Sequence, residues 1–142
     1  MKERSKIMCV AVLILSVLAM SSTALALRGM SVQQPLSAER ILEASARISI
    51  TGKVISGTAK TTASAKCARI TSVFTLQKWN GSAWLDHKTA SKNRQESAIS
   101  VETVAFSAVA SGSYRLKVSH RIYSGSVLKD SRTSYTNSVT VP

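Results

Sequence analysis

Residues 113–123 read SYRLKVSHRIY and alternate without exception between two kinds of side chain. One set is mostly apolar: Tyr114, Leu116, Val118, His120 and Ile122. The other set is mostly polar: Arg115, Lys117, Ser119, Arg121 and Tyr123. Because successive side chains of a β-strand point to opposite faces, this period of two predicts a strand with one face in a core and the other in water.

Similar alternation extends from this stretch in both directions and covers residues 46–142, where β-branched residues are dense and proline is absent until Pro142. We therefore predict an all-β domain with strands at about residues 46–52, 54–65, 68–79, 83–90, 97–106, 113–123 and 127–141. In the last strand, Thr133 and Tyr135 are expected to face the core and Arg132 to face water. About seven short strands at this spacing are typical of an immunoglobulin-like antiparallel β-sandwich.

The strongest local turn signal is WNGSAW, residues 79–84. Asn-Gly between two strand-like runs supplies the positive φ angles that a tight hairpin requires. A four-residue loop places Trp79 opposite Trp84, whereas a two-residue loop places them on a diagonal. In either geometry, Trp79 and Trp84 are candidates for an aromatic contact with sugar rings at the hairpin tip, and burial of one of them in the end of the core is the alternative.

The turn before the first stretch reads VASGSYRL, residues 109–116, and resembles the turn that leads into the sixth strand of immunoglobulin-like sandwiches. In those folds a Gly-x-Tyr step forms a tyrosine corner, so the resemblance implies that the Tyr114 hydroxyl donates to a nearby backbone carbonyl. Leu116 stands where true immunoglobulin domains often have cysteine. The likeness is therefore to the architecture and not to antibody domains.

Three further motifs extend the likeness: LQKWNGSAW at residues 76–84, GSYR at residues 112–115 and TSYTNSV at residues 133–139. Together with the leader and the polar arm that precede them, they resemble small secreted proteins of Gram-positive bacteria that form a domain-of-unknown-function family. The similarity covers roughly residues 46–142, and turn and strand signatures imply a fold and not an activity. No functional residue is carried over.

The first 26 residues are expected to be a signal peptide that is removed. Lys2, Arg4 and Lys6 give a positive start, residues 7–20 form an apolar run, and residues 24–26 supply a cleavage site. The run is shorter than the roughly 20 residues of a transmembrane helix, so we expect an extracellular protein, with no transmembrane segment after removal of the signal. Residues 27–45 are expected to form a flexible arm, with a short helix after Ser37 as the alternative.

Basic residues dominate the chain, with 19 Lys and Arg against 7 Asp and Glu and a formal net charge of +12. Removal of the signal leaves 16 basic and 6 acidic side chains, a net charge of +10. Such a surplus predicts attraction to polyanions, among them phosphate-bearing wall polymers, acidic glycans, anionic lipids and nucleic acid. The alternative is that the charge only keeps a surface rich in serine and threonine soluble.

Few residues after the signal suit catalysis or metal binding. Asp86 and His87 are neighbours on an expected strand, so their side chains point to opposite faces and cannot form an acid–imidazole pair. The sequence has neither the ligand spacings of a zinc site nor a glycine-rich phosphate loop. Cys67 is expected to be a small buried group, with an intermolecular disulfide or a nucleophile as the alternatives. We therefore expect no cofactor, no metal and no enzymatic activity, with a hydrolase that uses His87 or His120 as the weakest alternative.

The expected fold gathers cations on one outer face, because the third, sixth and seventh strands are neighbours in immunoglobulin-like order. This candidate surface for an anionic ligand contains Arg69, Arg115, Lys117, Arg121 and Arg132. Guanidinium groups bind phosphate and carboxylate through paired hydrogen bonds, which suits a repeating anionic polymer. A solvated strand face without a ligand is the alternative. Nucleic acid is not an expected partner, since no base-reading motif accompanies the charge.

The sequence thus favours a secreted, non-enzymatic module that binds anionic cell-envelope polymers or cell-wall material, or that has a structural role at the cell surface. A small secreted toxin or bacteriocin-like effector is the alternative from another functional class. Neither interpretation determines the oligomeric state.

Overall fold

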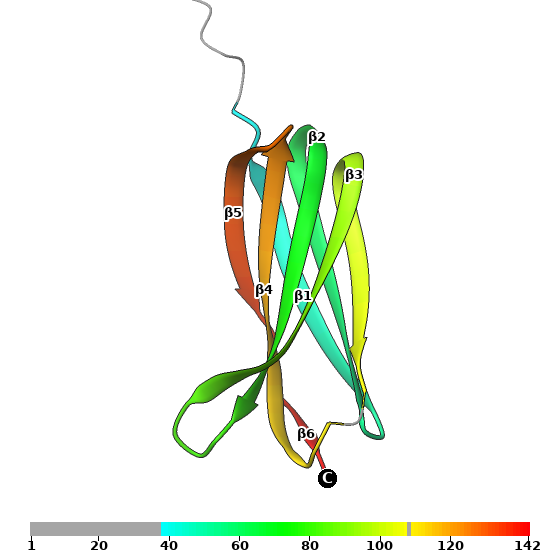
Figure 1. The fold of residues 1–142 in the computed structure, drawn as a ribbon, viewed down its shortest axis with the longest axis vertical. Helices are drawn as coiled ribbons and strands as arrows, with labels where there is room; N and C mark the ends of the chain where they lie inside the picture. The colour runs from blue at the N-terminus through cyan, green and yellow to red at the C-terminus, as the bar shows by residue number, and fades with distance from the viewer. Residues whose placement is uncertain (1–37, 108) are drawn as a thin grey trace, which may run out of the picture. The chain divides into compact units, whose positions relative to one another are not determined.

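Strands make up nearly all of the structure, a computed structural model that describes residues 38–107 and 109–142 (Figure 1). The strands are β1 (Ile41–Thr51), β2 (Val54–Trp79), β3 (Trp84–Phe106), β4 (Gly112–Ser124), β5 (Val127–Tyr135) and β6 (Val139–Val141). All their pairings are antiparallel, which confirms the all-β prediction. The described residues contain no helix that is long and apolar enough to cross a membrane. The expected signal peptide and residues 27–37 of the expected arm lie outside the described residues.

Six strands replace the expected seven because two pairs of expected strands are continuous and the last expected strand is divided in two. Residues 54–65 and 68–79 join in β2, and residues 83–90 and 97–106 join in β3. β2 bends where the register shifts between Thr62 and Cys67, and β3 bends at Glu96, whose φ is 47°. Irregularities of this kind redirect strands without ending them. In β2 the buried positions have odd numbers up to Ala63 and even numbers from Ile70 to Leu76.

The two ends of the domain also differ from expectation. β1 begins at Ile41, so residues 41–45, expected in the arm, belong to the first strand. The Ile41 side chain is fully buried, and its N–H donates to Asp130 Oδ2 at 2.8 Å. This short polar segment therefore forms a strand because its first residue is held by residues distant in the sequence. The Ile41 side chain packs in an apolar cluster, and the Asp130 carboxylate accepts a hydrogen bond from its amide. At the other end, residues 127–141 are divided into β5 and β6.

β2 and β3 bend together, so that the sheet folds into two halves that face each other (Figure 1). The first half-sheet contains β1, residues 54–63 of β2 and residues 99–106 of β3. The second half-sheet contains residues 84–97 of β3, residues 67–79 of β2, and β4, β5 and β6. The two long strands therefore contribute to both halves.

The main apolar core lies between the half-sheets. Phe74 of β2 and both Leu116 and Val118 of β4 are fully buried, as the alternation predicts. Gly57 in the first half-sheet lies against Leu116 and Phe74, so a side chain at position 57 would meet Leu116. A second, smaller apolar cluster comprises Ile41, Ala63, Cys67, Ile70 and Ile122.

A polar layer lies between the two apolar clusters. His120 sits between core residues of β4 and is fully buried. Its Nδ1 lies 2.7 Å from Thr61 Oγ1, and its Nε2 lies 2.7 Å from Ser134 Oγ. Burial lowers the pKa of His120 to about 4, so the ring is neutral at pH 7. Since Thr61 belongs to the first half-sheet and Ser134 to the second, this imidazole links the two halves.

Two local predictions are confirmed at the turns. Tyr114 donates from its hydroxyl to the Ala110 carbonyl at 2.7 Å, which is the expected tyrosine corner. Trp79 pairs directly with Trp84 across a four-residue loop, with ring centroids 5.3 Å apart. Gly81 in that loop has a φ of 102°, a left-handed conformation that glycine adopts without strain. Short-range sequence signals were sufficient for both features because their partners are close in the chain.

Candidate anionic-ligand surface

The outer face of the second half-sheet carries four of the five cations that the sequence singled out. In the register of β2 with β4, Arg69 lies opposite Tyr123, Thr71 opposite Arg121, Thr75 opposite Lys117 and Gln77 opposite Arg115. These positions alternate with fully buried ones, so their side chains point away from the core. The fold therefore brings Arg69, Arg115, Lys117 and Arg121 together on one face.

Arg132 does not lie on this face. β5 pairs with β4 so that Arg132 is opposite the buried His120, and Tyr135 is opposite Lys117. The expected orientation of β5 is therefore wrong, because Thr133 and Tyr135 face outward and Arg132 lies on the inward side of the sheet. The expected single strand at residues 127–141 is interrupted between β5 and β6, so Thr133 and Tyr135 do not share a face with the inward Val139 and Val141. Few large apolar residues in β5 mark the inward face.

Aromatic rings stack on two of the guanidinium groups. The Cζ atom of Arg115 lies 4.7 Å from the ring centroid of Trp84 and 4.8 Å from that of Tyr135. The Cζ atom of Arg69 lies 4.2 Å from the ring centroid of Tyr123. Distances below about 6 Å give a favourable cation–π interaction. Stacking uses the flat face of guanidinium and leaves its N–H edge for hydrogen bonds to an anion.

A hydrogen-bonded chain across three strands also holds Arg115. Its Nε donates to Gln77 Oε1 at 2.8 Å, and Gln77 Nε2 donates to Asp86 Oδ1 at 2.7 Å. Among the described residues, the terminal nitrogens of Arg115 make no hydrogen bond. The guanidinium is therefore oriented by its neighbours, with donors left for a ligand.

We call this surface the arginine–aromatic face. It consists of Arg69, Trp79, Trp84, Arg115, Lys117, Arg121, Tyr123 and Tyr135. Along β4, Arg115 and Lys117 are about 7 Å apart and Arg121 lies about 13 Å beyond Lys117, from the rise of a strand. Trp79 is 39% exposed and Tyr135 is 54% exposed. The face can therefore hold several anionic groups at once and stack flat rings between them.

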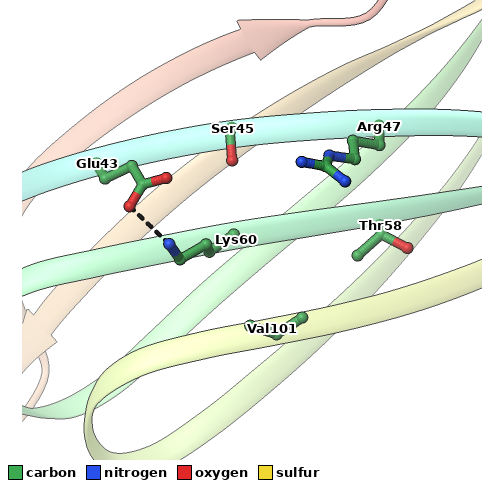
Figure 2. A pocket seen from close by; sticks show the side chains of 6 residues that line it. All are labelled: Glu43, Ser45, Arg47, Thr58, Lys60 and Val101. Carbon is green, nitrogen blue, oxygen red and sulfur yellow. Dashed lines mark hydrogen bonds and ion pairs between the residues drawn. The ribbon is translucent and has the colours of Figure 1, made fainter.

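A groove of about 300 Å³ lies on the outer face of the first half-sheet (Figure 2). It is lined by Glu43, Ser45, Arg47, Thr58, Lys60 and Val101. Figure 2 shows Lys60 and Glu43 pointing toward each other, with Nζ 2.8 Å from Oε2. The hydrogen bond from Lys60 lowers the pKa of the Glu43 carboxyl. Because one of its two cations is paired in this way, the groove has much less free positive charge than the arginine–aromatic face.

The described residues offer little for catalysis or metal binding. They contain no group of three His, Cys, Asp or Glu side chains that could hold a metal ion. Ser134 and His120 are close enough for a nucleophile–base pair, but the other imidazole nitrogen lies against Thr61 and not against a carboxylate. A pKa of about 4 also makes His120 a weak base at neutral pH.

Cys67 is buried, as the sequence predicted. Burial, and secondarily the charge of Glu39, raise the pKa of the Cys67 thiol. A raised pKa disfavours the thiolate, which is the nucleophilic form. Cys67 therefore acts as a small apolar group of the second cluster.

Sequence reasoning missed two members of the surface network, Asp86 and Tyr135, and also missed the contact of Gln77 with Arg115. Gln77 and Asp86 are not close in the sequence to Arg115, and only the pairing of β3, β2 and β4 brings them into contact. Tyr135 was expected on the opposite face of its strand. No local pattern marks these contacts, because each depends on strand register.

A scan of protein-family models finds no match to the chain, and a search of curated proteins finds no similar sequence. The resemblance to small secreted proteins of Gram-positive bacteria therefore stays a prediction.

Proposed function

We propose that this protein is a secreted, non-enzymatic module that binds anionic glycopolymers of the cell envelope through the arginine–aromatic face. The observation that carries the proposal is the gathering of four cations on one flat face, two of them stacked on aromatic rings. A polymer with regularly spaced phosphate or carboxylate groups would meet several cations at once. Sugar rings between those groups would stack on exposed aromatic side chains such as Trp79 and Tyr135.

We also propose that the fold is an immunoglobulin-like sandwich of the kind found in the small secreted proteins that the sequence resembles. Support comes from the facing half-sheets, from the Tyr114 corner and from the neighbouring positions of residues 67–79, β4 and β5. In this interpretation, β2 and β3 each combine two sandwich strands across a bend. Counting the two parts of β2 and of β3 separately, and β6 as a continuation of β5, restores seven strands.

The test is the binding of the purified chain to soluble poly(glycerol phosphate), measured by isothermal titration calorimetry at several salt concentrations. The variant combines Arg115→Gln, Lys117→Gln and Arg121→Gln. Each cation near an anionic surface contributes up to about 1 kcal/mol, so we expect the affinity to fall at least about tenfold. The dependence of affinity on salt should also become shallower, because fewer charge contacts are screened.

A matched control removes the same amount of charge elsewhere by combining Lys53→Gln, Lys92→Gln and Arg132→Gln. Lys53 lies in the turn between β1 and β2, Lys92 pairs with Ser72 on the inward side, and Arg132 pairs with His120. The control should retain nearly all of the affinity. Equal losses in the two variants would mean that only net charge matters, and unchanged binding in the first variant would contradict the proposed face.

A further inference from the structure

β3 forms a free edge along both half-sheets. It pairs with β2 over its length, and none of the described strands lies on its other side. A strand edge presents unpaired N–H and C=O groups that can pair with a further strand. The two parts of this edge differ in how they are protected against such pairing.

Charges protect residues 84–97. Lys88, Lys92 and Arg94 lie opposite Leu76, Ser72 and Ile70, so they stand on the inward side of the edge strand. The register with β2 also shifts within this part. Inward-pointing charges and bulges are devices by which proteins prevent edge-to-edge association. A second copy of this basic chain would meet cations here.

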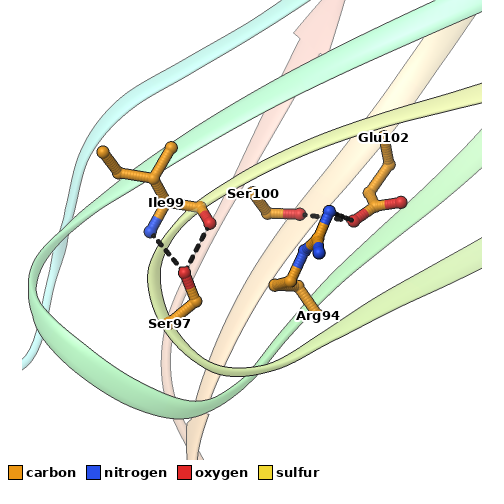
Figure 3. Close-up of polar contacts among 5 residues, drawn as sticks. All are labelled: Arg94, Ser97, Ile99, Ser100 and Glu102. Atoms are coloured by element: carbon orange, nitrogen blue, oxygen red, sulfur yellow. Dashed lines mark hydrogen bonds and ion pairs between the residues drawn. The ribbon is translucent and has the colours of Figure 1, made fainter.

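Residues 99–106 carry no cation. Glu102, their single charged residue, lies opposite the buried Ala59 on the inward side, and its charge is paired, since its Oε1 lies 3.1 Å from a terminal nitrogen of Arg94 (Figure 3). Ile99 is 54% exposed and Val101 is 52% exposed. In a chain with a formal net charge of +12, this part of the edge is therefore a place where two copies can approach without repulsion between cations.

The register determines which backbone groups point to the free edge. Residues 52–53 form a two-residue turn between the paired residues Thr51 and Val54. Thr51 and Val54 therefore bond to each other, and every second residue of β2 after Val54 bonds to β1. The intervening, odd-numbered residues of β2 bond to β3. Their partners in β3 are the even-numbered residues from 100 to 106. The odd-numbered residues with groups left for the free edge are Val101, Thr103 and Ala105.

Two contacts agree with this assignment. Thr58 Oγ1 lies 3.1 Å from Thr103 Oγ1, and side chains come closest in pairs that do not hydrogen-bond to each other. Ile99, two residues before Val101, has both its N–H and its C=O within hydrogen-bond distance of Ser97 Oγ, at 3.1 and 2.6 Å (Figure 3). Ser97 thus satisfies the edge at Ile99, and the unpaired edge begins at Val101.

We propose that residues 101–105 pair antiparallel with the same residues of a second copy, around a two-fold axis at Thr103. Thr103 then exchanges two hydrogen bonds with the partner's Thr103, and Val101 lies opposite the partner's Ala105. Such pairing is self-complementary, as a two-fold interface requires, and joins the two first half-sheets into one sheet. The arginine–aromatic faces lie on the second half-sheets and stay free in the dimer. The proposal does not depend on the ligand of those faces.

A disulfide trap tests both the partner and the register. In a Cys9→Ser background of the full chain, Thr103→Cys places two thiols in a directly hydrogen-bonded pair whose Cα atoms are about 5.5 Å apart. That distance is within the range that a disulfide spans. We expect mild oxidation to convert Thr103→Cys to a covalent dimer, while Val101→Cys dimerises poorly alone and couples to Ala105→Cys in a mixture.

The matched control is Ser91→Cys, on the protected part of the same strand. Oxidation of Thr103→Cys that yields no more dimer than Ser91→Cys would contradict the proposal. Pairing of this edge with another protein, or with residues 27–37 of the same chain, would give that result, because the partner's Thr103 would be absent from the contact.

Sedimentation velocity over a range of concentrations supplies an independent measurement without cysteine. Thr103→Pro removes a donor that points away from β2, so the native pairing of β3 is kept while the dimer dissociation constant rises at least about tenfold. Val101→Lys, at an exposed position, should weaken the dimer in the same direction by adding like charge. A chain that stays monomeric at all concentrations, or a dimer unaffected by both variants, would overturn the proposal.

Discussion

The two half-sheets share one core but present different outer faces. On the first, Lys60 is paired with Glu43 beside small hydroxyl groups. On the second, Arg115 is stacked between Trp84 and Tyr135 with donors left free. Inward positions of both halves have to fill the core and are therefore similar, whereas outward positions are not constrained by packing. The chemical difference between the two outer faces is therefore determined by every second residue of a few strands.

The contacts between the half-sheets are of two kinds. His120 connects Thr61 in the first half to Ser134 in the second through its two ring nitrogens. Gly57 lets the first half approach Leu116 of the second without an intervening side chain. Substitutions of His120 and of Gly57 test the two kinds of contact separately. Substitutions of single cations compare the outer and inward positions by their effect on binding to poly(glycerol phosphate).

The largest effect is expected when His120 becomes protonated. Its pKa is lowered to about 4 in the folded protein, so between pH 6.5 and 4 the unfolded chain binds more protons than the folded one. The stability associated with His120 is therefore full above pH 6.5 and is lost as the pH falls toward 4, by up to about 3 kcal/mol. Urea unfolding at a series of pH values measures this loss.

His120→Gln should remove most of that pH dependence, whereas His87→Gln, at an exposed position, should keep it. The comparison uses the slope of stability against pH, because His120→Gln also lowers stability at all pH values. Identical slopes in the wild type and His120→Gln would show that this imidazole does not govern the acid sensitivity of the contact between the halves.

The next effect is expected from Gly57→Ala. A Cβ atom at position 57 meets Leu116, which is fully buried and has little room to move, so we expect a destabilisation of about 1–3 kcal/mol. Chemical denaturation measures the change. Ser56→Ala, on the outer face of the same strand, is the control and should change stability by less than about 0.5 kcal/mol. A neutral Gly57→Ala variant would mean that the halves adjust their separation freely.

The smallest effect is expected from single cations on the outer face. Arg121→Gln removes one contact of the arginine–aromatic face and should weaken binding to poly(glycerol phosphate) by about two- to fivefold, since exposed charge pairs contribute less than about 1 kcal/mol. Arg132→Gln removes the same charge from a position on the inward side of the sheet and should have little effect. Equal effects in the calorimetric titration would show that the register of β5 does not matter for binding.

Prediction from the sequence succeeded where one strand carries large apolar side chains at alternate positions. Leu116 and Val118 are fully buried in the structure, while Arg115 and Lys117 face outward, as expected. It failed for the faces of β5, where Tyr135 is the largest side chain and is exposed. An aromatic group on an outer face produces the same alternation as one in a core, so the pattern alone did not distinguish the two orientations.

Expectations about boundaries failed for a related reason. Ile41 was placed in a flexible arm because the segment around it is polar and short, yet its side chain and its amide are both held by distant residues. The bends of β2 and β3 were expected to be ends of strands, although pairing continues on both sides of each bend. Local composition does not report contacts of high sequence separation.

Properties that follow from neighbouring residues were readable in the chain: the alternation of β4, the Trp79–Trp84 hairpin, the corner at Tyr114 and the surplus of positive charge. Properties that follow from strand register required the folded molecule: the stacking of Arg115, the inward position of Arg132 and the link between the half-sheets through His120. The physical reason is that backbone geometry imposes a period of two on every strand, whereas the choice of neighbours depends on how the whole core closes.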